Sequence, residues 1–243
     1  MNITYIGHSG FLMDTGSAYF LFDYYNGIIP EMDTSKPLIV FTSHKHQDHF
    51  NPGIFRLADI YPGTLFVLAK GVPYKNLAVK YSKNIASQGD FKNILPVKKD
   101  ISLDVILSNR EKLGIRTLRS TDEGVAFLLL YNGKRYYHAG DLNLWIWDSE
   151  TEEYNRNMEK RYITEMEKLK GMEIDIAFVP LDPRLGGNAY AGLKTFLSYV
   201  HCKHVFPMHC WGNYGIIDSF IEEYPEYKEQ IVKILYENQC YRF

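Results

Sequence analysis

The chain has 243 residues, enough for one large domain with a substantial core. Hydrophobic residues make up 46% and charged residues 23%, as in an ordinary globular protein. The net charge of −2 suggests no general binding of nucleic acid or anionic membranes, and no apolar run approaches the roughly 18 residues of a membrane helix. We therefore expect a cytoplasmic protein with a single domain over residues 1–243 and no membrane insertion.

Apolar periodicity and turn residues predict strands first and then alternating helices and strands. Asn132-Gly133 is a strong hairpin signal between two of the strands. The predicted strands cover 2–7, 10–14, 18–23, 38–41, 64–69, 101–107, 114–118, 125–130, 134–138, 173–180, 203–208 and 231–235. The predicted helices begin at Asn51-Pro52 and cover 74–87, 155–170, 189–200 and 216–221.

One loop concentrates the residues that bind metals. Directly after the strand Leu38–Phe41, the stretch Thr42–His49 contains His44, His46, Asp48 and His49. Imidazole nitrogens and carboxylate oxygens bind Zn²⁺ and similar ions at about 2.0–2.2 Å. The spacing is too tight for one tetrahedral ion to take all four residues, so His44 and His46 would serve one ion, and Asp48 and His49 a second.

This H-x-H-x-D-H motif resembles that of the metallo-β-lactamase-fold hydrolases. Two later segments, Tyr136–Asp141 and Val205–His209, are similar to the strands of that superfamily that end in Gly-Asp and in a histidine. The start of the chain, Ile3–Phe11 with Leu21-Phe22-Asp23, is similar to the branch of ascorbate-6-phosphate lactonase-like proteins and N-acyl-phosphatidylethanolamine phospholipase D. The resemblance covers residues 3 to 209.

The resemblance implies an α/β (α+β) fold: a four-layer αββα sandwich in which two facing mixed β-sheets are flanked by helices. It implies a metal-dependent hydrolase with one or two divalent ions per chain, zinc above manganese or iron. The implied roles are a bridging ligand for Asp141, completion of the second metal site for His209, and a proton carrier for Asp48, which is also a ligand. The implied metal ligands are His44, His46, Asp48, His49, Asp141 and His209.

The chain departs from the superfamily at one ligand. Most members have a further histidine between the H-x-H-x-D-H motif and the strand that ends in Gly-Asp. Here no histidine lies between His49 and His138. Asp122 or Ser120 could replace the missing donor, which would give a harder site that tolerates Mn²⁺ or Fe²⁺ better. Alternatively, the first site is weak and the working protein holds one ion.

Other residues near these motifs would serve the substrate or the ligands. His8 lies on the early turn that the resemblance places beside the metals, and Asp23 would orient a ligand histidine by accepting its other ring N–H. Arg184 suits a carboxylate or phosphate, although a surface salt bridge is the alternative. Of Trp145 and Trp147, we expect one to line a pocket and one to pack in the core.

Three functions remain open at this stage. The first is a hydrolase that uses metal-activated water on a small ester, lactone or phosphodiester. The second is an RNA-processing nuclease of the same fold, for which the chain lacks a basic arm, and the third is a metal-binding or sensing protein without hydrolytic activity. We expect a small molecule as the partner and do not expect nucleic acid, and the sequence leaves the oligomeric state open.

Overall fold

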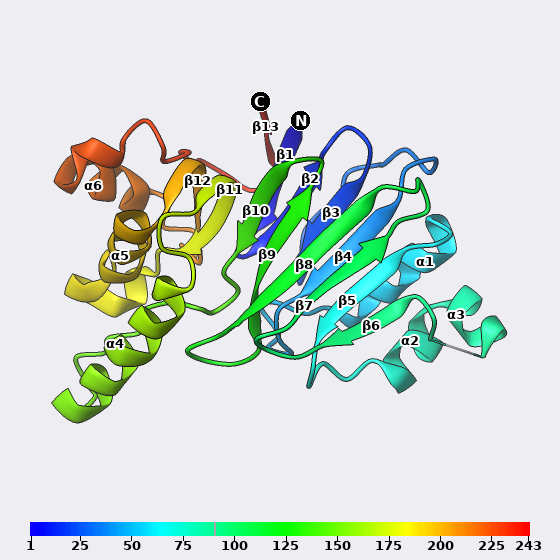
Figure 1. Ribbon diagram of the computed structural model, residues 1–243, viewed down its shortest axis with the longest axis horizontal. Helices are drawn as coiled ribbons and strands as arrows, with labels where there is room; N and C mark the ends of the chain where they lie inside the picture. Colours follow the sequence, from blue (N-terminus) through cyan, green and yellow to red (C-terminus); the bar gives the residue numbers. More distant parts are fainter. Residues whose placement is uncertain (90) are drawn as a thin grey trace. The chain divides into compact units, whose positions relative to one another are not determined.

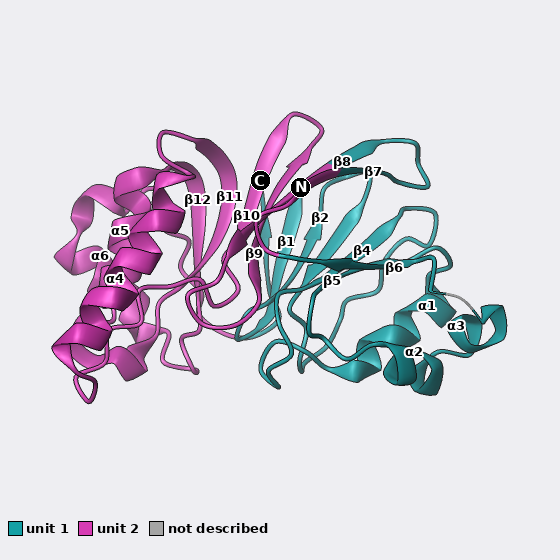
Figure 2. Ribbon diagram, turned by 60° about the horizontal axis from the view of Figure 1, so that its bottom comes forward, with its two compact units in different colours: residues 1–98, 104–113, 237–243 teal, residues 99–103, 114–236 magenta. Residues whose placement is uncertain are grey.

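The computed structural model describes residues 1–89 and 91–243. The chain divides into two compact units (Figure 2). Unit 1 contains residues 1–98, 104–113 and 237–243, and unit 2 contains residues 99–103 and 114–236. The predicted class, α/β with two mixed sheets and helices, is confirmed by sheets of seven and six strands. The prediction of one domain over 1–243 stays a prediction.

Unit 1 is built on the seven-stranded sheet, in the order β13-β1-β2-β3-β4-β5-β6 (Figure 1). Strands β3 to β6 run parallel to one another, whereas β2 is antiparallel to both β1 and β3. The C-terminal ends of β1, β3 and β4 therefore lie at one edge of the sheet. The strands are β1 (Asn2–Gly7), β2 (Gly10–Asp14), β3 (Tyr19–Phe22), β4 (Leu38–Thr42), β5 (Leu65–Ala69), β6 (Ile94–Val97) and β13 (Gln239–Arg242).

The helices of unit 1 lie together beside β5 and β6 (Figure 1). The predicted cap is present: the Asn51 side chain accepts the Gly53 N–H at 2.8 Å, and a 3-10 helix begins at Pro52. The predicted helix over 74–87 is two helices, because Ser82 is extended and its Oγ accepts the Ile85 N–H to start the second. The elements are η1 (Pro52–Arg56), α1 (Leu57–Ile60), α2 (Lys75–Tyr81) and α3 (Lys83–Gln88).

Unit 2 contains most of the six-stranded sheet, in the order β12-β11-β10-β9-β8-β7. Strands β10, β11 and β12 are parallel, so their C-terminal ends also share one edge. The hairpin predicted at Asn132-Gly133 joins β9 to β10, and both residues have positive φ. The strands are β7 (Ser102–Ile106), β8 (Lys112–Arg119), β9 (Val125–Tyr131), β10 (Lys134–His138), β11 (Glu173–Pro180) and β12 (His201–Met208).

The long helices of unit 2 lie beside β11 and β12 (Figure 1). The apolar stripe predicted for the first of them is buried at Met158, Tyr162 and Met166. Among the described residues no helix is long and apolar enough to cross a membrane. The elements are α4 (Glu152–Glu167), η2 (Pro183–Asn188), α5 (Ala191–Tyr199), α6 (Gly215–Glu223) and η3 (Pro225–Tyr227).

One strand prediction was wrong, and two strands were not predicted. The segment 231–235 is not a strand, since it makes only an isolated bridge between Ile231 and Val205. The last strand is instead β13, which pairs with β1. The sequence also gave no expectation of β6, which pairs with β5 in parallel although it contains Pro96.

Candidate metal centre

In unit 1 the H-x-H-x-D-H loop starts where β4 ends. The five residues of β4 are all buried, which anchors the start of the loop in the core. The loop then turns back on itself, because the N–H groups of His49 and Phe50 both donate to the carbonyl of His46 at 3.0 Å. His44 and His49 are buried, with 1% and 0% of their surface exposed. The rigid strand end and the tight turn together fix both rings.

One buried carboxylate holds this loop from behind. Asp23 follows β3 with a φ of +39° and is fully buried. Its Oδ1 accepts the Ser43 N–H at 2.7 Å, and its Oδ2 accepts the Ser43 hydroxyl at 2.5 Å. The same Oδ2 lies 2.7 Å from Nδ1 of His49. Asp23 therefore occupies the position in which a carboxylate orients a metal-binding histidine.

These bonds fix the tautomers of two histidines. Asp23 can only accept when ionised, so His49 carries its proton on Nδ1. The one hydroxyl proton of Ser43 goes to Asp23, so Ser43 Oγ must accept from Nδ1 of His44, 2.9 Å away. In both rings the lone pair is then on Nε2, the atom that a metal ion would take.

His46 faces the Nε2 of His44. The Nδ1 atom of His46 lies 3.0 Å from that Nε2. Two ligands of one tetrahedral zinc ion are about 3.4 Å apart, since each lies about 2.1 Å from the metal. The two nitrogens therefore have the separation of neighbouring ligands on one ion.

A second group of donors in unit 1 gathers around Asp48. His8 follows β1 with a φ of +53°, and its Nε2 lies 3.3 Å from Asp48 Oδ2. The Nε2 of His49 lies 3.9 Å from the same oxygen. One ligand atom from each of the three residues lies within 4.8 Å of the others. His8, which the sequence placed only near the site, is thus positioned to be a ligand itself.

In unit 2 the two predicted donors adjoin each other. Asp141 follows β10 through Ala139 and Gly140, and Gly140 has a φ of +52° that turns the chain at the strand end. His209 follows β12 with a φ of +66°. Both side chains are buried, and Nε2 of His209 lies 3.0 Å from Oδ1 of Asp141.

A second buried carboxylate holds His209 as Asp23 holds His49. Asp182 follows β11, and its Oδ2 lies 3.1 Å from Nδ1 of His209. Burial alone would raise the pKa of Asp182, but the hydrogen bonds from His209 and Arg184 outweigh it and hold the pKa below its ordinary value. The ionised carboxylate keeps the proton of His209 on Nδ1 and its lone pair on Nε2.

The donor set fits a divalent metal ion. Nε2 of His209 and Oδ1 of Asp141 are both acceptors once Asp182 fixes the tautomer, and acceptors 3.0 Å apart repel unless a cation or a proton lies between them. In unit 1 the lone pair on Nε2 of His44 faces Nδ1 of His46 at 3.0 Å, a separation that suits either a hydrogen bond from His46 or a shared ion. Imidazole and carboxylate are ligands of Zn²⁺, Mn²⁺ and Fe²⁺ alike.

The remaining predicted residues lie as follows. Arg184 is half exposed and pairs with Asp182, whose Oδ2 lies 2.6 Å from its Nη2. Asp122 is exposed and donates its N–H to Ser120 Oγ at 3.1 Å. Asp122 belongs to no group of three or more His, Cys, Asp or Glu ligands among the residues that the structure describes. A replacement ligand at these two positions stays a prediction.

Sequence reasoning missed two residues of the site. Ser43 and Asp182 each contact a predicted ligand and orient its ring, a role that the sequence analysis assigned only to Asp23. Asp182 could have been found by analogy with Asp23, because each is an aspartate directly beyond a buried strand. Nothing in the sequence marks Ser43 except its place before His44.

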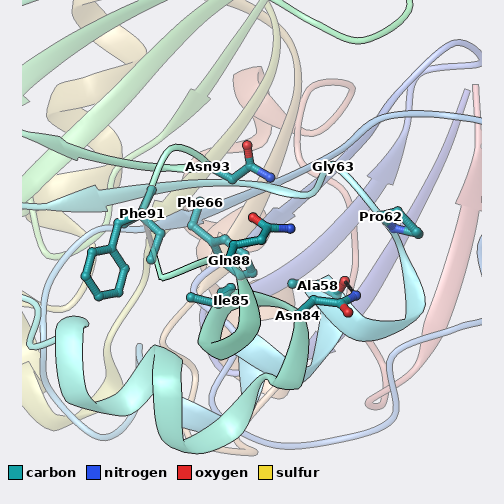
Figure 3. Close-up of a pocket in the computed structure, with 10 residues that line it drawn as sticks. Ala58, Pro62, Gly63, Phe66, Asn84, Ile85, Gln88, Phe91 and Asn93 are labelled. Carbon is teal, nitrogen blue, oxygen red and sulfur yellow. Dashed lines mark hydrogen bonds between the residues drawn. The ribbon is translucent and has the colours of Figure 1, made fainter.

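Two cavities lie apart from these donors. One in unit 1, of about 60 Å³, has the amide side chains Asn84, Gln88 and Asn93 at its rim (Figure 3). It has room for about two water molecules and is too small for a substrate. The other, in unit 2, has a volume of about 360 Å³ and includes Asp175 and Lys203. It lies at the starts of β10 to β12, whereas Asp141 and His209 follow their ends.

Two curated proteins match almost the whole chain. A protein of Heliobacterium modesticaldum is 24% identical over 251 residues, which cover 99% of this chain and 93% of the relative. A protein of Alkaliphilus metalliredigens is 25% identical, with both chains covered completely. Both carry the name of metal-dependent hydrolase.

A similar solved structure is that of Igni18, a metallo hydrolase of the archaeon Ignicoccus hospitalis. It covers 100% of this chain and 98% of its own, with a TM-score of 0.62 and 17% identity, which shows a shared fold. The family model described as a β-lactamase superfamily domain matches residues 2–157. That match covers more than half of the 243 residues and confirms the resemblance seen in the motifs, so the chain belongs to the β-lactamase superfamily.

Proposed function

We propose that the protein is a metal-dependent hydrolase that acts on a small ester, lactone or phosphodiester. The proposal rests on how the lone pairs of two histidines are directed. In unit 2 Asp182 sets the lone pair of His209 on Nε2, which faces the Asp141 carboxylate at 3.0 Å. In unit 1 Ser43 sets the lone pair of His44 on Nε2, which faces Nδ1 of His46 at 3.0 Å. This arrangement is suited to a cation held between the paired atoms. The names of the full-length relatives support the same activity.

The proposed ligands are the residues that the sequence motifs imply, with one addition. Unit 1 contributes the four residues of the loop motif, and we add His8 because of its distance to Asp48. Unit 2 contributes Asp141 and His209. The full proposed set is His8, His44, His46, Asp48, His49, Asp141 and His209.

A divalent ion bound by these residues would lower the pKa of water from 15.7 to about 7 and polarise the oxygen of the scissile bond. Asp48 is the residue best suited to carry the proton. Its side chain is 28% exposed, whereas that of Asp141 is 6% exposed. Asp48 can therefore exchange a proton with solvent and with a leaving group, while Asp141 remains a ligand.

We propose zinc as the ion, with Mn²⁺ or Fe²⁺ as alternatives. Four histidines of unit 1 and one of unit 2 make the proposed set rich in nitrogen, and imidazole suits zinc and iron better than it suits magnesium or calcium. The number of ions, one or two, is open to direct measurement. Elemental analysis of protein purified without added metal or chelator gives both the identity and the number.

The test combines metal content with turnover. Protein reconstituted with Zn²⁺, Mn²⁺ or Fe²⁺ is assayed on δ-valerolactone, p-nitrophenyl acetate and bis-p-nitrophenyl phosphate. We expect turnover with at least one metal, and loss of both metal and turnover in His46→Ala and Asp141→Ala. The control is His201→Ala, since His201 is an exposed histidine at the start of β12.

The outcomes separate the alternatives. Absence of metal from the wild type, even after reconstitution, would overturn the metal centre itself. Tight metal binding without turnover of any substrate would instead favour a metal-binding or sensing protein. Cleavage of RNA, with an affinity that falls steeply as salt rises, would favour the nuclease.

A further inference from the structure

Two of the three tryptophans flank His209 in unit 2, and the third, Trp147, packs on one of them. The Trp145 ring lies edge-on to His209 at 5.7 Å and nearly parallel to Trp147 at 6.3 Å. On its other side, His209 meets Trp211 at 6.0 Å. The guanidinium of Arg184 lies 4.4 Å from the centre of the Trp211 ring and 6.0 Å from that of Trp147. These five side chains form a closed circuit of contacts, which we call the tryptophan circuit.

The members of the tryptophan circuit differ in exposure. Trp145 is buried, with 6% of its surface exposed, and its Nε1 donates to the carbonyl of Asp141 at 2.9 Å. Trp147 is half-buried, and Trp211 is 48% exposed. Trp145 therefore packs around Asp141 and His209. Trp147 and Trp211 present ring surface to solvent.

Trp211 is held in a conformation that a bulky residue rarely adopts. Its φ is +51°, in the left-handed region that costs most residues about 1–2 kcal/mol. The ring is fixed in spite of this, because Nε1 donates to Asp182 Oδ2 at 3.2 Å and the Arg184 guanidinium lies on its face. A strained, exposed and rigidly held aromatic residue two positions after a metal donor is a candidate for substrate contact.

Arg184 does not give this surface a strong positive charge. Its Nε and Nη2 both bond to the carboxylate of Asp182, in the paired geometry that guanidinium and carboxylate prefer. The anion-binding role that the sequence suggested for Arg184 is thus satisfied within the protein by Asp182. Arg184 therefore adds little net charge to the exposed tryptophan rings beside His209.

We propose that Trp147 and Trp211 bind a flat, uncharged aromatic or conjugated group of the substrate next to the bond that is cleaved. This inference rests on the proposed hydrolase function and names its substrate class. Aromatic rings prefer offset or edge-to-face contact with a partner ring, and such contacts add to the area that is buried. A saturated substrate of equal ring size lacks this contact.

The test uses a matched pair of lactones with zinc-loaded protein, or protein loaded with the ion that supports most turnover. Dihydrocoumarin is δ-valerolactone fused to a benzene ring, so the two differ mainly in the flat group. Their lactam counterparts, 3,4-dihydroquinolin-2-one and 2-piperidone, resist hydrolysis and report binding alone by equilibrium dialysis. We expect wild type to bind the aromatic lactam about tenfold more tightly than the saturated one.

Four variants test which side chains cause the preference for the aromatic lactam. Trp211→Ala and Trp147→Ala are each expected to lose about three- to tenfold in affinity for the aromatic lactam and to leave 2-piperidone unchanged. Trp211→Phe keeps a ring but loses the hydrogen bond to Asp182, so it should retain most of the preference. Tyr236→Ala removes an exposed aromatic residue of unit 2 outside the tryptophan circuit and should change nothing.

Binding of the lactams tests the aromatic site, and turnover of the lactones tests the hydrolase function separately. Equal affinity for both lactams, or a preference that survives both alanine variants, would refute the aromatic site even if both lactones are hydrolysed. If Trp211→Phe behaves as Trp211→Ala does, the ring acts only through Asp182 and the proposal also fails. A tryptophan-dependent preference without turnover of either lactone would support the aromatic site and exclude lactones as the class of substrate that is hydrolysed.

Discussion

Replacing Asp23 by asparagine tests whether one buried carboxylate prepares two metal ligands. The substitution keeps the shape of the side chain but converts one acceptor oxygen into a donor NH₂ group. In the wild type both oxygens accept, from the Ser43 N–H, the Ser43 hydroxyl and the His49 ring. The amide can take only two orientations, and each has a calculable consequence.

In the first orientation the amide oxygen stays on the Ser43 N–H and the NH₂ group meets Ser43 Oγ and His49. Nδ1 of His49 must then accept, which moves the ring proton to Nε2. The Ser43 hydroxyl turns its proton toward His44, which also moves to the Nε2–H tautomer. Both predicted ligands lose their lone pair, so metal affinity should fall by about 10- to 100-fold, or about 1.4–2.8 kcal/mol.

In the second orientation the NH₂ group faces the Ser43 N–H. Two donors then meet at the position where the wild type has a 2.7 Å hydrogen bond. Because Asp23 is fully buried, water cannot relieve this contact, and the free energy of unfolding should fall by about 1–3 kcal/mol. The protein must therefore lose metal affinity, stability or both.

The assay measures both quantities on the same preparations. Competition with a chromophoric chelator gives the zinc affinity, and urea denaturation of the metal-free protein gives the free energy of unfolding. Asp33→Asn is the control, since Asp33 is exposed and accepts only within its own turn, from Ser35. An Asp23→Asn variant with unchanged zinc affinity and unchanged stability would refute the tautomer argument.

Three further predictions test the packing, the thiols and one ion pair. In Gly192→Ala the new Cβ would lie 1.8 Å from Oδ1 of buried Asn143, so urea denaturation should show a loss of about 1–3 kcal/mol. Of the three cysteines only Cys240 is exposed, and burial raises the pKa of the other two thiols to about 12. Ellman's reagent at pH 8 should therefore react quickly with one thiol per native chain. Burial raises the pKa of Asp175, but the hydrogen bonds from Lys203 and the Arg135 N–H and the nearby lysine charges together outweigh it and lower the pKa. This carboxylate therefore stabilises the fold above its ordinary pKa of about 3.9. That contribution disappears as the pH falls through the lowered pKa, and Asp175→Asn should flatten the loss of stability measured in this acid range.

Matched variants make these three tests decisive. Gly187→Ala meets no atom within 4 Å and should change stability little, so an equal loss in both glycine variants would contradict the packing argument. Cys240→Ser should abolish the fast thiol reaction, and a fast phase that persists would show that a buried cysteine is accessible. Asp104 pairs with Lys112 while more than half exposed, so Asp104→Asn should leave the acid profile unchanged. An acid profile of Asp175→Asn identical to wild type would exclude that ion pair as a source of acid sensitivity.

The sequence located the strands that carry the site because each is a short buried run that ends at a polar residue. The β4 run is buried at every position, and the loop motif follows it directly. The same pattern identified Asp23, Asp141 and His209. The family motifs supplied what periodicity could not, namely which of these strand ends hold ligands.

The sequence failed where structure depends on distant partners. The segment 231–235 has the apolar content of a strand, but its Ile231 and Ile234 are buried while Leu235 is 60% exposed, and no strand forms there. The segment of β13 is polar and becomes a strand only because it pairs with β1 at the other end of the chain. Likewise the roles of Ser43 and Asp182 exist only in the folded protein, where each meets a histidine ring.

The left-handed backbone at His8, Asp23 and His209 sets stability and function against each other. Glycine at each of these positions would relieve the backbone strain, because it adopts the same φ without steric penalty. Laboratory evolution under heat alone should therefore enrich glycine or asparagine at His8 and His209, but keep Asp23, whose buried carboxylate accepts from Ser43 and His49. Selection that alternates heat with turnover should keep all three unchanged, so the contrast between the two lineages would show which residues this protein retains at the expense of its own stability.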